Sequence, residues 1–155
     1  MCRGMIECRN KLGIMISNVV YLSRKGGAQR IADAIAAECG TEAHNIAERH
    51  VLGQTDLLFV GTGIYGHQPE QEILNYLDNL PLNTIRGAAV FSVSKDGRDH
   101  TELVINLLRH KGIAVYPKHF FCPKQSLFRN HGRPNSVDVM NARAFAREVL
   151  NAYQG

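Results

Sequence analysis

A short loop rich in glycine and positive charge is the stretch of this sequence best suited to chemistry. It follows an apolar run at residues 19–22 and consists of Ser23, Arg24, Lys25, Gly26, Gly27 and Ala28. Glycine lets a ligand approach the backbone and tolerates a positive φ, and the free amides at the start of the following helix attract anions. The pattern predicts a phosphate-binding loop. The alternative is an ordinary short connection between a strand and a helix.

A second glycine-rich segment follows the apolar run at residues 57–60. Residues 61–66 match the spacing G-x-G-x-x-G, but in dinucleotide-binding proteins this motif follows the first strand and opens directly into a helix. Here Pro69 delays the helix. We interpret the segment as a mobile loop that contacts a ring-shaped ligand, and the alternative is an ordinary loop with a partly buried aromatic residue. Its candidate ligand contacts are Thr62, Gly63, Ile64, Tyr65 and Gly66.

A third polar loop follows the apolar run at residues 88–93. Its candidate ligand contacts are Ser94, Lys95, Asp96 and Gly97. The sequence contains neither a Walker phosphate motif nor the G-x-S-x-G motif of hydrolases. A phospho-receiver site would need carboxylates at the ends of strands 1 and 3, where this chain has Ser23 and Gly61. We therefore assign no catalytic side chain.

Cysteine and histidine are scattered rather than clustered. The four cysteines show no C-x-x-C spacing, and the seven histidines are spread from position 44 to position 131. This spacing predicts no metal site and free thiols in a reducing, cytoplasmic compartment. Cys122, beside Pro123, is interpreted as a buried structural thiol.

The composition is that of one globular domain. The 155 residues are 45% hydrophobic and 21% charged, with a formal net charge of +4 that favours anionic partners in a general way. No apolar run approaches the roughly 18 residues of a membrane helix. Residues 1–11 lack the apolar core of a secretory signal. Residues 1–14 are expected to be a disordered extension or the product of an upstream start, since Met15 stands just ahead of the first strand, and a single domain is expected at residues 15–155.

Apolar runs alternate with stretches of helical periodicity along the chain. Strands are expected at residues 19–22, 42–46, 57–60, 88–93 and 113–116, and helices at residues 28–39, 69–80, 103–111 and 136–153. Pro69 is expected to open its helix and Ser136 to cap the last one. The alternation predicts a three-layer α/β sandwich with a five-stranded parallel sheet in the order 2-1-3-4-5. Ligands are then expected above the gap between strands 1 and 3.

Residues 118–135 show no clear periodicity and interleave basic with aromatic side chains. The residues concerned are Lys118, His119, Phe120, Phe121, Lys124, Phe128, Arg129, His131 and Arg133. Such interleaving is typical of surfaces that bind single-stranded nucleic acid, but no nucleic-acid motif accompanies it. We therefore favour a loop packed on the core with solvated cations, and we expect neither a nucleic-acid nor a membrane partner.

With these loops placed, residues 18–153 resemble the flavodoxin family. The resemblance is carried by the strand, loop and helix of residues 21–35, by the segment DLLFVGTGIYG at residues 56–66, and by the loop after the fourth strand. It implies a flavodoxin-like fold with bound FMN, held by three loops at the carboxyl ends of strands 1, 3 and 4. Ferredoxin-like modules, joined to such domains elsewhere, would need clustered cysteines that this chain lacks.

Two features depart from the family pattern. The family's phosphate loop reads Ser/Thr-x-Thr-Gly-x-Thr, whereas this chain has Ser23, Lys25, Gly26 and Ala28 at the matching positions. Typical members are acidic, whereas this chain is basic. The expected function is that of an FMN-binding electron carrier whose redox partner protein the sequence does not identify. The alternatives are a flavodoxin-fold oxidoreductase linked to NAD(P)H or a quinone, a flavodoxin-like oxidase, and a flavin-free binding module.

Overall fold

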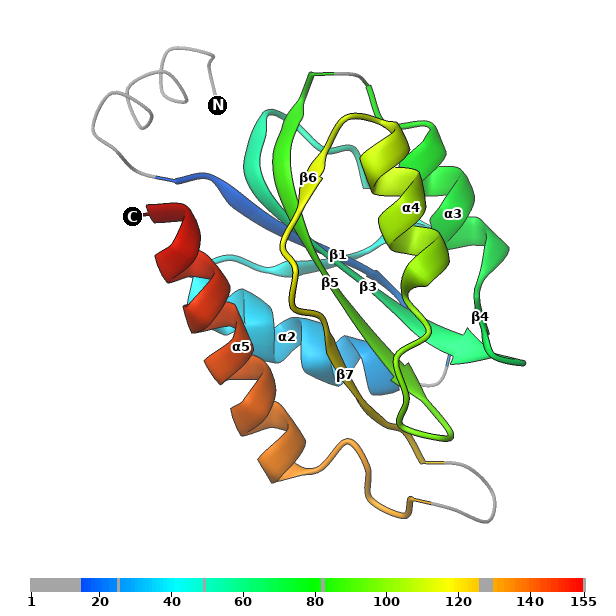
Figure 1. The fold of residues 1–155 in the computed structure, drawn as a ribbon. Helices are drawn as coiled ribbons and strands as arrows, with labels where there is room; N and C mark the ends of the chain where they lie inside the picture. The colour runs from blue at the N-terminus through cyan, green and yellow to red at the C-terminus, as the bar shows by residue number, and fades with distance from the viewer. Residues whose placement is uncertain (1–14, 25, 49, 82, 126–129, 155) are drawn as a thin grey trace.

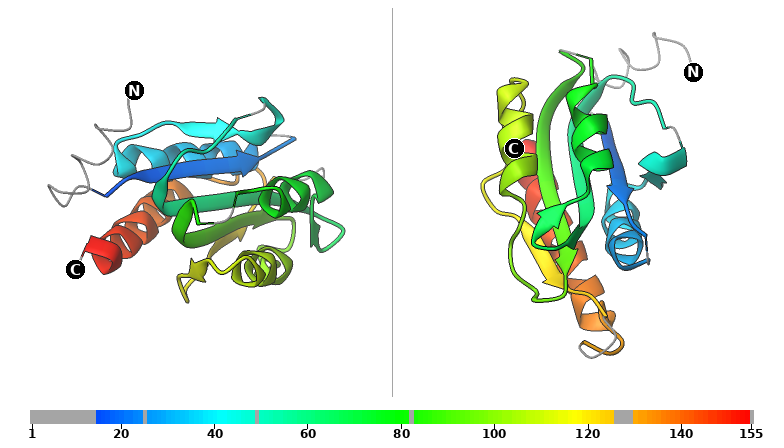
Figure 2. Two further views of the ribbon diagram at one scale, coloured as in Figure 1. Left: turned by 90° about the horizontal axis from the view of Figure 1, so that it is seen from above. Right: turned by 90° about the vertical axis from the view of Figure 1, so that its right-hand side faces the viewer.

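A computed structural model describes residues 15–24, 26–48, 50–81, 83–125 and 130–154, and it forms three layers (Figures 1 and 2). The strands are β1 Ser17–Leu22, β2 Ala43–Asn45, β3 Thr55–Tyr65, β4 Gln68–Pro69, β5 Ile85–Ser94, β6 Ala114–Val115 and β7 Phe120–Pro123. The helices are α2 Gly27–Cys39, α3 Gln71–Asp78, α4 Glu102–His110 and α5 Ser136–Gln154. Among the described helices none is long and apolar enough to cross a membrane. The extension expected at residues 1–14 lies outside the described residues.

The sheet has the strand order β2-β1-β3-β5-β6, which confirms the predicted order of five parallel strands. Two short strands were not predicted. β4 pairs antiparallel with β3, and β7 pairs parallel with β5. β6 pairs with the start of β5, at Gly87 and Ala88, whereas β7 pairs with its last four residues. The fifth position of the sheet is therefore filled by two pieces of chain, with Pro117 between them.

The two central strands, β3 and β5, are apolar along most of their length because both of their faces are covered. On one face Phe59 and Phe91 pack against α2 and α5. On the other face Leu58 and Val90 pack against α3 and α4. Figure 2 shows the sheet between these helix pairs. This arrangement confirms the predicted sandwich.

A close approach between β3 and β5 explains one glycine. A Cβ atom at Gly61 would lie 1.9 Å from Cε2 of Phe91, so the phenyl ring occupies the space that a side chain would need. Gly61 pairs with Phe91 in the register of the two strands. The first glycine of the G-x-G-x-x-G pattern is therefore required for packing within the sheet.

The prediction of a mobile loop at residues 61–66 is wrong, because β3 continues through Tyr65. The chain then turns back through Gly66 and His67, with φ values of 59° and 64°. Two successive positive φ values are typical of the type I′ turn that closes a tight hairpin. Pro69 pairs with Ile64 in β4 and does not open the helix, which begins at Gln71.

The start of α5 is capped one residue earlier than predicted. Asn135 Oδ1 accepts a hydrogen bond from the Asp138 amide at 3.0 Å, and the Asp138 carboxylate accepts one from the Asn135 amide at 2.8 Å. This reciprocal pair is a capping box, with Asn135 and not Ser136 as the N-cap. Arg133 adds two hydrogen bonds to the same carboxylate, at 2.6 and 2.8 Å. The Arg133 hydrogen bond holds the Asp138 pKa below its usual value.

The close packing at Gly61 predicts a large effect of a single methyl group. Gly61→Ala should lower the free energy of unfolding by about 1–3 kcal/mol, because the Phe91 ring must move to admit a Cβ. Gly53→Ala is the matched control, since no atom lies within 4 Å of a Cβ built there. Urea unfolding of both variants tests the prediction. Equal stability of Gly61→Ala and Gly53→Ala would contradict it.

The Asp138 cap predicts a loss of stability in acid. A carboxyl whose pKa is lowered on folding stabilises the native state above its unfolded pKa of about 3.9, and this contribution disappears as the pH falls through the folded pKa. Asp138→Asn should therefore cost about 1.5–3 kcal/mol at pH 7, where a charged hydrogen-bonded group is lost. The difference from wild type should shrink below about pH 4. Unfolding free energies between these pH values test this, with the exposed Asp78→Asn as control.

Candidate functional site

The carboxyl ends of β1, β3 and β5 meet at one end of the sheet, where the three predicted loops begin. A cavity of about 550 Å³ lies there between the turn after β3 and the loop after β5. It is lined by Ile64, Tyr65, Gly66, His67, Ser94, Lys95, Asp96 and His100. The structure therefore brings two of the three predicted segments together around one space.

The first loop leads into the start of α2, which has no side-chain cap. Ser23 Oγ accepts a hydrogen bond from the Gly26 amide at 3.0 Å, which closes the turn. Gly26 has a φ of 85° and caps α2 without any side-chain hydrogen bond. The first amides of a helix have no partner within it, so this end of α2 offers N–H donors to an anion. Ala28 is fully buried, so only its backbone can take part, and Lys25 lies outside the described residues.

Tyr65 connects the first loop to the cavity. The Arg24 guanidinium lies 5.6 Å from the centre of the Tyr65 ring, and the Lys124 ammonium lies 3.5 Å from it. Arg24 also forms an ion pair with the buried Glu70, at 2.6 Å. Burial raises the Tyr65 pKa, and the nearby Glu70 raises it further. The phenol therefore stays neutral, with positive charge close to its ring.

Lys124 is a site residue that sequence reasoning missed. We expected a solvated cation in a loop, but its side chain is only 7% exposed. Its backbone amide donates to the Ser94 carbonyl at 2.9 Å, which continues the line of β7 along β5. The unrecognised strand β7 is therefore the reason for the error. A lysine directly after a short apolar strand was the only signal available.

Not every predicted contact on β3 faces the cavity. Thr62 is fully buried, and its hydroxyl donates to the Gly63 carbonyl at 2.8 Å. Gly63 lies beneath the Tyr65 ring, since a Cβ there would be 3.2 Å from Cε2 of that ring. Ile64 borders the cavity although it is only 3% exposed. Tyr65 and Gly66 border it as well.

The loop after β5 is organised around the carboxylate of Asp96. Asp96 Oδ1 accepts hydrogen bonds from the Ser94 hydroxyl at 2.9 Å and from the Arg98 amide at 3.0 Å. These bonds, the Arg98 amide foremost, hold the pKa of Asp96 far below its usual range. Gly97 has a φ of 68°, and a Cβ there would lie 2.9 Å from Cγ of Pro123. Internal bonds and close packing thus define the shape of this loop.

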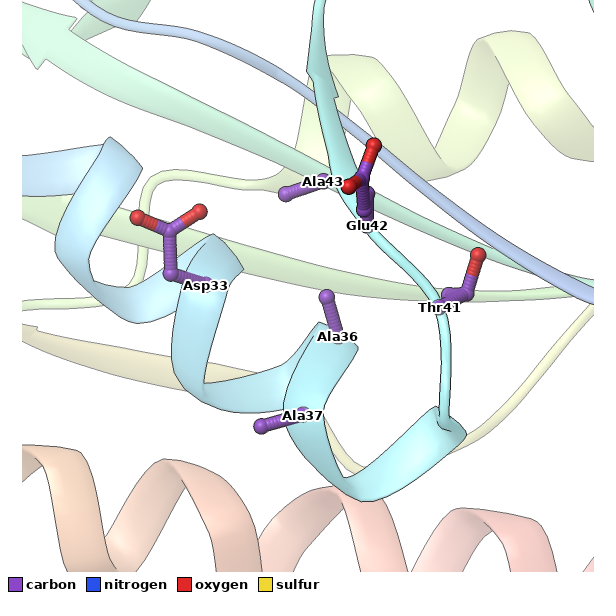
Figure 3. Close-up of a pocket in the computed structure, with 6 residues that line it drawn as sticks. All are labelled: Asp33, Ala36, Ala37, Thr41, Glu42 and Ala43. Atoms are coloured by element: carbon purple, nitrogen blue, oxygen red, sulfur yellow. The ribbon is translucent and has the colours of Figure 1, made fainter.

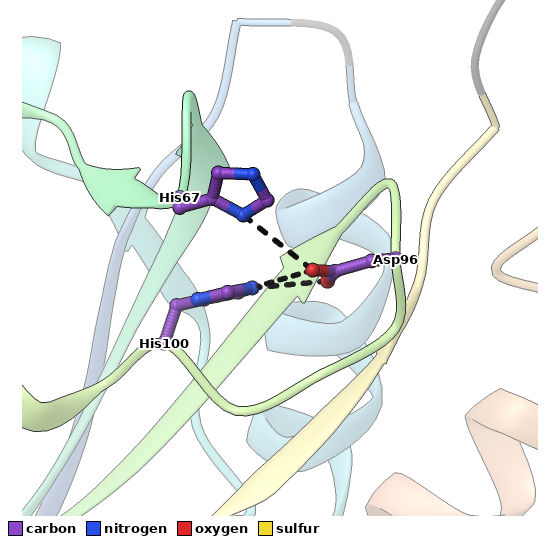
Figure 4. Close-up of side chains that lie close together, drawn as sticks. All are labelled: His67, Asp96 and His100. Atoms are coloured by element: carbon purple, nitrogen blue, oxygen red, sulfur yellow. Dashed lines mark hydrogen bonds and ion pairs between the residues drawn. The ribbon is translucent and has the colours of Figure 1, made fainter.

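Two histidines meet Asp96 at the rim of the cavity (Figure 4). His100 Nε2 lies 2.9 Å from Asp96 Oδ2, and His67 Nδ1 lies 3.5 Å from the same oxygen. We predicted no metal site because the histidines are spread along the sequence. The β3–β4 turn and the β5–α4 loop nevertheless bring two of them together.

The basic and aromatic segment after β6 is largely tied to the rest of the protein. His119 Nδ1 lies 2.9 Å from Asp99 Oδ2, and Asp99 also accepts hydrogen bonds from the amide and the hydroxyl of Thr101. Lys118 contacts Glu148 at 3.4 Å. Phe120 packs against the core, while Phe121 is 44% exposed. Phe128 and Arg129 lie outside the described residues.

A second, more open cavity of about 370 Å³ lies between the second half of α2 and β2 (Figure 3). It is lined by Asp33, Ala36, Ala37, Thr41, Glu42 and Ala43. None of the predicted site residues borders it. It lies beside the C-terminal end of α2, whereas the predicted loop opens the other end of that helix.

The described cysteines are unreactive at neutral pH. Burial raises the pKa of the Cys39 thiol to about 11 and that of the Cys122 thiol to about 12. A thiol acts as a nucleophile or metal ligand in its deprotonated form. Both residues carry free thiols, and Cys122 is buried as predicted.

Comparisons with known proteins agree with the fold. A profile of the flavodoxin domain matches residues 18–124. Among solved structures, a flavodoxin from the domain Archaea has a TM-score of 0.73 at 16% identity, covering 90% of this chain and 99% of that one. A flavodoxin, WrbA-like protein from Agrobacterium tumefaciens has a TM-score of 0.67 at 20% identity, covering 90% and 98%.

Part of a longer protein is also similar in fold. The rubredoxin oxygen:oxidoreductase of Desulfovibrio gigas has a TM-score of 0.60 at 14% identity, covering 89% of this chain but 36% of that one. A search of curated protein sequences gives no significant match. Structural likeness at these identities shows the fold, while the domain profile shows the family. The chain belongs to the flavodoxin family.

Proposed function

We propose that this protein binds FMN and transfers electrons through it. The observation that carries the proposal is the cavity between the β3–β4 turn and the β5–α4 loop, next to the uncapped start of α2. A volume of about 550 Å³ lies within the usual range of cofactor sites. These features support a phosphate bound at the start of α2 and a planar ring bound in the cavity.

The first loop fits the phosphate end of FMN. The start of α2 offers backbone amides without a side-chain cap, and helix N-termini favour anions. Gly26 leaves open space, since no atom lies within 4 Å of a Cβ built there. Lys25 supplies positive charge at a position where other family members have a hydroxyl, and Arg24 beside it adds a second charge. Phosphate recognition would thus rest on amides and charge, with Ser23 shaping the turn.

The cavity fits the ring end of the cofactor. Ile64 and Tyr65 provide apolar and aromatic surface on one side, and the loop of Ser94 to Gly97 provides polar groups on the other. When bound, FMN would supply the one- and two-electron chemistry of a flavin. The protein's own part is to hold the ring, limit its contact with water and set the charge around it. Lys124 and Arg24 would favour negative charge near the Tyr65 ring.

The proposal predicts that the purified protein carries a flavin. It should show flavin absorbance, and the flavin released on denaturation should be FMN, as judged by chromatography against FMN, FAD and riboflavin. Steady-state assays with NAD(P)H and quinones should show negligible turnover for an electron carrier. Rapid turnover would instead identify an oxidoreductase on this fold. Failure to bind added FMN would overturn the proposal and favour a flavin-free binding module.

The composition of the first loop predicts salt-sensitive binding of the phosphate. Lys25→Ala should weaken FMN binding by about tenfold or more, because a charge-assisted contact contributes about 1.5–3 kcal/mol. The loss should be larger at low salt. Riboflavin, which lacks the phosphate, should bind both proteins equally. Fluorescence titration measures all of these affinities.

The matched control is Arg86→Ala, which removes one exposed charge near the opposite end of β5. This variant should bind FMN within about twofold of wild type, because a charge so placed is largely screened. Equal FMN affinity for wild type and Lys25→Ala at all salt concentrations would contradict a role for position 25. It would leave the amides of α2 as the phosphate site.

A further inference from the structure

We propose that His67, Asp96 and His100 form a binding site for a divalent transition-metal ion of the zinc type. The ligand atoms of these three residues all lie within 4.8 Å of one another (Figure 4). Imidazole nitrogens and a carboxylate oxygen are common zinc ligands. The three residues also line the cavity proposed for the flavin ring, so Zn²⁺ binding is tested with and without FMN.

The distances between the ligand atoms are close to those of a tetrahedral metal site. In a tetrahedral site with bonds of about 2.0–2.1 Å, neighbouring ligand atoms are about 3.3–3.4 Å apart. His67 Nδ1 lies 3.5 Å from Asp96 Oδ2, and His100 Nε2 lies 2.9 Å from it. All three ligand atoms lie within 4.8 Å of one another, so side-chain rotation of the histidines would bring both nitrogens and this oxygen around one ion. The 3.5 Å separation is also long for a hydrogen bond.

The surroundings orient the carboxylate as supporting residues do in metal sites. The Ser94 hydroxyl and the Arg98 amide both bond to Asp96 Oδ1. Such bonds fix the orientation of a ligating group. His100 Nε2 contacts both carboxylate oxygens, at 3.0 and 2.9 Å, and His67 Nδ1 lies nearest to Oδ2. His67 is 78% exposed, so an ion can enter from solvent.

A histidine and an aspartate can also form a hydrogen-bonded pair without an ion. The protein contains such a pair elsewhere, and it differs from the group at Asp96. His119 contacts Asp99 at 2.9 Å, but there Thr101 and not a second histidine completes the group. At Asp96 the second imidazole comes from a different segment, at a turn residue with a φ of 64°. An ion held here would join the two segments that enclose the cavity. Three protein ligands would leave a further position for water or another ligand.

Zn²⁺ titration of the full chain by calorimetry tests the proposal, with and without added FMN. Wild type should bind about one Zn²⁺, and His67→Asn and His100→Gln should each weaken binding at least tenfold, because even supporting groups contribute about 10–100-fold. Asn tolerates the positive φ at position 67, and Gln retains a hydrogen-bond donor for Asp96. His110→Gln removes an exposed imidazole on α4 and is the matched control. It should bind within about twofold of wild type.

Co²⁺ provides a second measurement that distinguishes this site from the thiols. Bound Co²⁺ should give visible absorption bands without the near-ultraviolet band of cobalt–thiolate bonds. Circular dichroism confirms that each variant is folded. The proposal is overturned if wild type binds Zn²⁺ no more tightly than folded His67→Asn, if His110→Gln loses binding equally, or if thiolate absorption accompanies Co²⁺.

Discussion

The pairing of β3 with β5 is the constraint on which the cavity depends. The two strands pair from Thr55 opposite Ile85 to Gly63 opposite Val93. This pairing is much longer than the short strands β2 and β6. The Phe91 ring fills the space above Gly61 and keeps the two strands aligned close to their carboxyl ends. The β3–β4 turn and the β5–α4 loop can face each other only because these strands end together.

Much of this architecture could be predicted from local sequence. Continuous apolar runs identify β1, β3 and β5, since parallel strands covered on both faces need no alternation. The helices follow from apolar residues at helical spacing, and the strand order follows from the alternation of strands and helices. Glycine and positive charge marked the first loop correctly as the start of α2. These features depend on residues that are near one another in the chain.

The errors have two physical causes: one hairpin has a weak local signal, and the other features depend on contacts distant in sequence. The turn at Gly66 and His67 was taken for a loop because β4 has only two residues and one is a proline. Strand β7 was missed because its pairing with β5, and not its own pattern, defines it. The grouping of His67 with His100 and the burial of Lys124 both follow from these two missed strands. Sequence spacing carries no information about such contacts.

Both edges of the sheet are short in the described part of the chain. On one side β2 has three residues, and on the other β6 has two and is separated from β7 by a segment containing Pro117. A long unpaired edge is a template on which another chain can add a strand, and short or interrupted edges prevent this. The backbone at either edge therefore offers another chain little to pair with, which opposes association of the protein through its sheet.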